Sequence, residues 1–123
     1  MNSDHNIDLP DSADFSYIQD IAGGQNDAFW NLLRIIGKNL REYPPQLVEA
    51  HQKGELEEVK TLAHKYKSCT AYLNFPQLDQ NLDGIEVGIA NGLRQEEVEP
   101  LIEKVKVLSD FMENEVSKAL GQQ

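Results

Sequence analysis

The chain has 123 residues, of which 11 are Lys or Arg and 21 are Asp or Glu, so its formal net charge is −10 at pH 7. This length suits one domain with a single core, and the negative charge argues against nucleic acid and anionic membrane surfaces as partners. Because Cys69 is the one cysteine, no internal disulfide can form, and without a secretory signal pattern or a bilayer-spanning apolar segment we expect a soluble cytoplasmic protein.

The N-terminal residues are polar and include Pro10. We predict a flexible segment over residues 1–13 and a helical domain over residues 14–120. The domain should open with a short helix over residues 14–21, in which apolar side chains recur at helical spacing before a pair of glycines. Such a helix can cap one end of a bundle.

A long helix is predicted over about residues 26–53, with an apolar stripe at helical spacing. Pro44 and Pro45 would ordinarily stop a helix, because each lacks the backbone N–H and crowds the preceding turn. Leu47 nevertheless returns to the azimuth of Phe29 if the helical count runs through the prolines. We predict a kinked but continuous helix, and two helices broken at Pro44 are the alternative.

Three more amphipathic helices are predicted, over residues 55–73, 76–91 and 95–119. They are separated by Gly54, by the turn before Pro76 and by Gly92, and neither a strand pattern nor a repeat is present. The pattern therefore predicts an all-α fold, an antiparallel up-down four-helix bundle with a short additional N-terminal helix.

His64 lies on the wrong side of its helix to be a core residue. The apolar stripe of this helix includes Val59, Leu62 and Tyr66. His64 is roughly 160° from the middle of that stripe, because each residue turns about 100° around the helix axis. The imidazole should therefore face water, either as an ordinary surface histidine or as a reactive group.

The neighbours of His64 on the outer face favour the reactive interpretation. Lys60 lies one turn before it, Lys67 and Ser68 lie one turn after it, and Ala71 lies about two turns on. An exposed imidazole with cationic neighbours and small residues beside it suits a nucleophile that accepts an anionic group from a large partner.

The run Ala-His-Lys-Tyr-Lys-Ser at residues 63–68 resembles the motif of histidine-containing phosphotransfer (HPt) domains, Ala-His-x-Leu-Lys-Gly followed by small residues. Three positions depart from the family pattern. Tyr66 replaces the usual Leu, Ser68 replaces the usual Gly, and Asn74 stands at a later glycine. Asn is the second choice after Gly for a left-handed helix end, and Ser is still small.

The resemblance implies that His64 accepts a phosphoryl group from a receiver-domain aspartate and passes it to another receiver in a two-component phosphorelay. Lys67 would stabilise the phosphoryl charge, with Lys60, Ser68 and Ala71 in supporting roles. The expected partners are receiver domains of response regulators or of hybrid sensor histidine kinases. The chain would be a monomer without a cofactor or autonomous kinase activity, since the family keeps its magnesium ion on the receiver.

Two further points stay open in the sequence. Tyr72 and Phe75 belong either to a docking surface for the receiver or to the core. A non-phosphorylated docking module that binds a receiver domain or a partner helix is the alternative function, because Ser68 adds bulk where the family has glycine.

The residues three positions before His51 and His64 are Val48 and Thr61, which excludes the Glu-x-x-His spacing of di-iron bundles.

Overall fold

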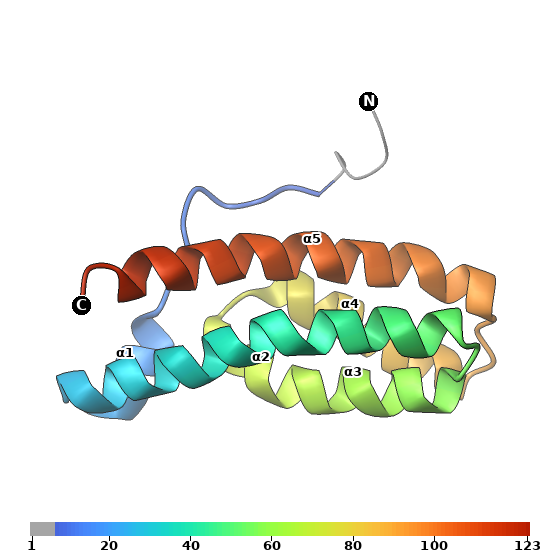
Figure 1. Cartoon of the computed structure of the whole chain (residues 1–123), viewed down its shortest axis with the longest axis horizontal. Helices are drawn as coiled ribbons and strands as arrows, with labels where there is room; N and C mark the ends of the chain where they lie inside the picture. The colour runs from blue at the N-terminus through green and yellow to red at the C-terminus, as the bar shows by residue number, and fades with distance from the viewer. Residues whose placement is uncertain (1–6) are drawn as a thin grey trace.

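The computed structural model describes residues 7–123, and over that range the chain is all-helical, with no strand (Figure 1). The short 3₁₀ turn η2, Ala71–Leu73, separates the third helix from the fourth. The helices begin and end within a few residues of the predicted bounds. They are α1 (Ser16–Ala22), α2 (Asn26–Gln52), α3 (Leu56–Thr70), α4 (Pro76–Ala90) and α5 (Gln95–Leu120).

The four longer helices pack side by side around one core and form a helical bundle (Figure 1). Helix α2 packs against α3 and α5, and α4 packs against the same two helices, so α2 and α4 lie diagonally opposite each other. Helix α1 lies against α2. No helix within residues 7–123 combines the length and the apolar character needed to cross a membrane.

The predicted flexible segment is described only from residue 7 onward. Residues 7–13 form no helix, but they hydrogen-bond to the bundle at two points. The Gln77 side-chain amide donates to the Asp8 carbonyl, and the Ala13 N–H donates to Glu115 Oε1 at 2.9 Å. This part of the segment is therefore tied to α4 and α5. Residues 1–6 of the prediction lie outside the described residues.

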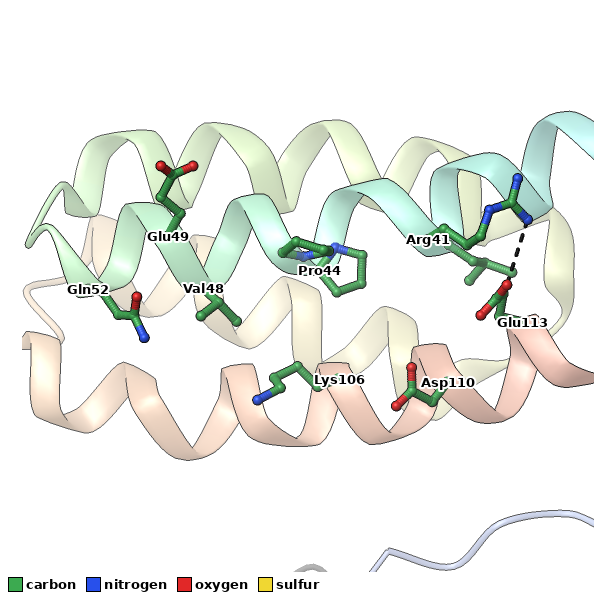
Figure 2. A pocket seen from close by; sticks show the side chains of 10 residues that line it. Arg41, Pro44, Val48, Glu49, Gln52, Lys106, Asp110 and Glu113 are labelled. Atoms are coloured by element: carbon green, nitrogen blue, oxygen red, sulfur yellow. Dashed lines mark ion pairs between the residues drawn. The ribbon is translucent and has the colours of Figure 1, made fainter.

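Helix α2 runs through Pro44 and Pro45 without a break, which confirms the prediction of continuity. Because proline has no N–H, the carbonyls of Leu40 and Arg41 lose their regular helical donors. Beside the prolines, a groove of about 440 Å³ lies between α2 and α5 (Figure 2). The Arg41 guanidinium and the Glu113 carboxylate, 3.6 Å apart, form an ion pair between these two helices.

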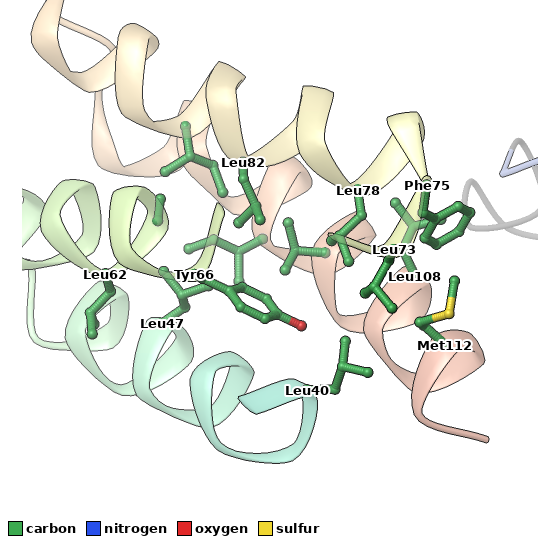
Figure 3. Close-up of a cluster of buried hydrophobic side chains, with 14 of the residues drawn as sticks. Leu40, Leu47, Leu62, Tyr66, Leu73, Phe75, Leu78, Leu82, Leu108 and Met112 are labelled. Atoms are coloured by element: carbon green, nitrogen blue, oxygen red, sulfur yellow. The ribbon is translucent and has the colours of Figure 1, made fainter. Parts of the chain in front are cut away.

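Tyr66 lies in the centre of the core and links α3 to its neighbours (Figure 3). Its ring stacks on Tyr43 of α2, with centroids 5.0 Å apart, and its hydroxyl lies 2.6 Å from the buried Ser109 Oγ of α5. Burial raises the pKa of the Tyr66 phenol, so the phenol stays neutral. The core accommodates a tyrosine at this position because Ser109 pairs with its hydroxyl.

Asn74 ends η2 in the left-handed conformation, with φ of 50°, as its sequence position predicts. Its side chain also makes a contact that glycine could not make. The Asn74 amide donates to Asp14 Oδ2 at 2.8 Å, and Asp14 Oδ1 accepts hydrogen bonds from both the hydroxyl and the N–H of Ser16. These bonds, those from Ser16 first, lower the pKa of the Asp14 carboxyl. The start of α1 is thereby attached to the α3–α4 connection.

We expect Tyr66→Phe to lower the free energy of unfolding by about 1–2 kcal/mol, because the Ser109 hydroxyl would be left buried and unpaired. Urea unfolding measures this loss. Tyr72→Phe, which changes an exposed hydroxyl, is the control and should have little effect. In the double variant with Ser109→Ala, the loss should be smaller than the sum of the single losses. An additive double variant would contradict the pairing.

A second prediction separates the two roles of Asn74. Asn74→Ala should destabilise the fold by about 1–2 kcal/mol, because alanine is strained at positive φ and cannot bond to Asp14. Asn74→Gly should cost less, since glycine adopts this φ freely and only the hydrogen bond is lost. Thermal and urea unfolding of both variants provide the measurement. Equal losses would show that backbone conformation is unimportant at this position.

Candidate functional site

His64 projects from α3 toward solvent beside α4, and 69% of its side chain is exposed. This confirms the predicted face. The residues of α3 that are buried lie on the opposite side, where Leu62, Ala63 and Tyr66 pack into the core. The position of His64 thus follows from the burial of its neighbours.

A carboxylate from α4 holds one of the two ring nitrogens of His64. Nδ1 lies 2.8 Å from Glu86 Oε2. An ionised carboxylate can only accept a hydrogen bond, so in the neutral ring Nδ1 carries the proton and donates it to Glu86. Nε2 then keeps its lone pair, and no group within residues 7–123 hydrogen-bonds to it. The geometry favours Nε2 as the nucleophilic atom.

Lys67 is paired with two carboxylates of α4. Its Nζ lies 2.7 Å from Asp83 Oδ1 and 3.3 Å from Glu86 Oε1. The hydrogen bond to Asp83, with a smaller contribution from Glu86, raises the pKa of the Lys67 ammonium. Lys67 is therefore a firmly charged group one turn from His64. We refer to His64, Lys67, Asp83 and Glu86 as the His64 site.

Glu86 contacts both partners and so connects the site. Burial alone would raise the pKa of its carboxyl, but the hydrogen bonds from Lys67 and His64 outweigh this and lower the pKa. Glu86 is therefore ionised at neutral pH. Its Oε1 is buried, and the Lys67 ammonium, 3.3 Å away, balances its charge.

The sequence analysis missed Asp83 and Glu86. Their sequence signal is weak, since the two carboxylates lie one turn apart on α4, off the buried stripe of Leu82, Ile85 and Ile89. Any solvated helix face can have this pattern. Only the packing of α4 against α3 brings these side chains to His64 and Lys67.

A shallow hollow adjoins the His64 site, and Ala71 and Ser68 line it as predicted, together with Asp79. The Ser68 hydroxyl donates to the Lys65 carbonyl of its own helix at 2.6 Å. A supporting role in which this hydroxyl donates to a phosphoryl group would therefore require it to leave an existing hydrogen bond.

Asp79 of α4 lines the hollow and also bonds to α3. Its Oδ1 accepts a hydrogen bond of 2.6 Å from the buried hydroxyl of Thr70. Burial raises the pKa of the Asp79 carboxyl, although the bond from Thr70 and the charge of Lys67 act in the opposite direction. Asp79 thus helps to fix α4 against the C-terminal end of α3.

Lys60 occupies a different environment from Lys67. Its Nζ lies 3.3 Å from Glu57 Oε1, one turn earlier on the same helix. Within residues 7–123 its only ion pair is this one, so the structure brings Lys67 into the His64 site and leaves Lys60 in a local pair.

The other candidates from the sequence are structural or peripheral. His51 Nε2 donates to the Gln95 carbonyl at 2.8 Å, and the Gln95 amide donates back to the His51 carbonyl, so this histidine clasps α2 to α5. Phe75 is buried against Phe111, whereas Tyr72 is exposed and stacks on Tyr17 of α1 with centroids 6.1 Å apart.

No cluster of three or more metal-ligating side chains occurs within residues 7–123. A comparison with models of known protein families finds no match, and a comparison with curated proteins finds none either. The function is therefore argued from the His64 site and from the motif around it.

We expect Lys67→Ala to raise the pKa of the Glu86 carboxyl, because the variant removes a hydrogen bond and a positive charge. A carbon-detected NMR titration of Glu86 measures it. Lys60→Ala is the control and should leave the titration unchanged.

Because the folded-state pKa is lowered, Glu86 stabilises the fold above its unfolded-state pKa, and this contribution is lost as the pH falls through the folded-state value. The contribution should shrink in Lys67→Ala, and an unaltered Glu86 titration would contradict the pairing.

Proposed function

We propose that this chain is a histidine-containing phosphotransfer protein, in which His64 accepts a phosphoryl group from a receiver-domain aspartate and passes it to another receiver in a phosphorelay. One observation carries the proposal most strongly: the exposed His64 ring has Nδ1 bonded to Glu86 and a charged Lys67 one turn away. The sequence motif at residues 63–68 adds to it.

The helix arrangement is compatible with the proposed class. We propose an antiparallel up-down four-helix bundle of α2 to α5 with α1 as a short addition, in one domain over residues 14–120. The short connections between successive long helices support this topology. We further propose a cytoplasmic monomer, since the apolar stripes of the helices are used within one core.

The proposed transfer needs no proton movement on the ring. The Nε2 lone pair attacks phosphorus, a new N–P bond forms, and the bond from phosphorus to the aspartate oxygen breaks with its electron pair leaving on the carboxylate. The ring, which keeps its Nδ1 proton, becomes cationic, and the Glu86 carboxylate stabilises that cation. In the reverse step the electron pair returns to Nε2.

Lys67 would act on the phosphoryl oxygens, since a positioned cation provides much of the stabilisation in phosphoryl transfer. We propose that magnesium acts on the partner receiver only and that this chain has neither a cofactor nor kinase activity of its own. Lys60, Ser68 and Ala71 stay predicted supporting residues. Lys60 would have to leave its pair with Glu57 to contribute.

The surface beside His64 suits a receiver domain as partner. Ala71 lines the hollow next to His64 and also a second hollow that Tyr17 and Asn74 line. The exposed Tyr17–Tyr72 stack therefore adjoins the small residues around the histidine. Exposed aromatic side chains with small residues between them favour protein contacts. We propose that receivers of response regulators or hybrid sensor kinases dock there.

A second candidate is a docking module that binds a receiver or a partner helix without being phosphorylated. The exposed Ser68 favours it, because its hydroxymethyl group stands one turn from His64 where a glycine would leave more room. The same surface would then serve binding alone.

The test is transfer from a labelled, phosphorylated receiver domain in the presence of magnesium. We expect labelled protein whose phosphoryl bond is acid-labile and base-stable, and no label in His64→Gln. His51→Gln, which changes a histidine outside the site, is the matched control and should be labelled like the wild type. Lack of label on folded wild-type protein, across a panel that includes the receivers of its own organism, would favour the docking module.

A further inference from the structure

Lys67 is already engaged before any phosphoryl group arrives. Its closest partner is Asp83, at 2.7 Å, and not Glu86, at 3.3 Å. Glu86 also binds the His64 ring, so its carboxylate has a role in fixing the nucleophile. Within residues 7–123 Asp83 makes no hydrogen bond or ion pair with His64, and Lys67 is its one ion-pair partner. The effect of Asp83 on the site therefore acts through the lysine.

We propose that Asp83 is a positioning residue that competes with the phosphoryl group for Lys67 and so lowers the share of phosphoryl held on His64 at equilibrium with a receiver. This inference rests on the proposed phosphotransfer function. It concerns how strongly the site retains the group, and not whether the group can bind.

Charge explains the direction of the effect. A phosphoryl group on Nε2 brings about two negative charges beside the carboxylates of Asp83 and Glu86. Lys67 can approach the phosphoryl oxygens only by weakening its contact with Asp83. This competition raises the free energy of the phosphorylated protein relative to the unphosphorylated one.

Transfer of the phosphoryl group from His64 to a receiver, which is the step that Asp83 affects, needs no other reactant. When the group leaves for a receiver, the N–P bond breaks, its electron pair returns to Nε2, and a carboxylate oxygen of the receiver aspartate forms the new bond to phosphorus. Asp83 takes part in neither bond. After departure, Lys67 regains its full contact with Asp83, and this recovered ion pair favours release.

The magnitude should be modest, because the Asp83 side chain is 57% exposed and the Lys67 side chain 30% exposed. Water screens a pair with this exposure. We therefore expect Asp83→Asn, which removes the charge and keeps the shape, to shift the transfer equilibrium about two- to fivefold toward phosphorylated His64.

The experiment measures the equilibrium ratio of labelled protein to labelled receiver, with a receiver that phosphorylates the wild type. Asp83→Glu should stay close to the wild type, because it keeps the charge. Glu42→Gln, which removes an exposed carboxylate on α2, is the matched control and should not shift the ratio. In a Lys67→Ala background, the effect of Asp83→Asn should largely disappear, because the competition needs the lysine.

Three results would overturn the inference in distinguishable ways. An unchanged ratio in Asp83→Asn, with the label still on His64, would reject the role of Asp83 and leave the phosphotransfer function intact. A shift of equal size with and without Lys67 would reject competition for the lysine. If the folded wild type receives no label on His64, the proposed function fails, and the inference fails with it.

Discussion

The burial of Tyr66 is the constraint on which the site depends. A buried phenol must find a hydrogen-bond partner, and here the partner is Ser109 on α5. Stacking on Tyr43 fixes the same ring from the side of α2. Rotating α3 about its axis would break both contacts at once. Since His64 lies two residues before Tyr66, on the opposite face of the helix, the interactions that hold the tyrosine inward also hold the histidine outward.

The electrostatic character of the site comes from α4 and not from α3 alone. Viewed on its own helix, His64 has lysine neighbours and suggests a cationic surface. Packing adds Asp83 and Glu86, so the lysine that faces the site is balanced before any anion approaches. The result is a histidine with one nitrogen committed to a carboxylate and the other open. The bond at Nδ1 depends on the contact between α3 and α4, whereas the exposure of the ring depends only on its position on α3.

Helical periodicity predicted the helices well, because burial follows a simple angular rule along each segment. It also predicted the continuity of α2 through Pro44, whereas the left-handed Asn74 was expected from the preference of Asn for helix ends. It could not predict Asp83 and Glu86, which lie 16 and 22 residues from their partners, because the register between α3 and α4 decides such pairs. The bond from Asn74 to Asp14 spans 60 residues and was hidden for the same reason. For Lys60 the structure shows a local ion pair with Glu57, and its supporting role near His64 stays a prediction.

One face of helix α4 packs in the core, and another carries the carboxylates of the His64 site. Leu82, Ile85 and Ile89 are buried and hold the helix in the bundle, while Asp83 and Glu86 lie off that stripe and bind Lys67 and His64 of α3 through their carboxylates. Residues on the buried face are constrained by packing, because even a small change of volume is felt there. Asp83, whose side chain is more than half exposed, is under less of that constraint. Substitution of Asp83 should therefore change the charge around His64 while leaving the packing of the bundle intact, so the electrostatics of the site can vary separately from the scaffold that holds it.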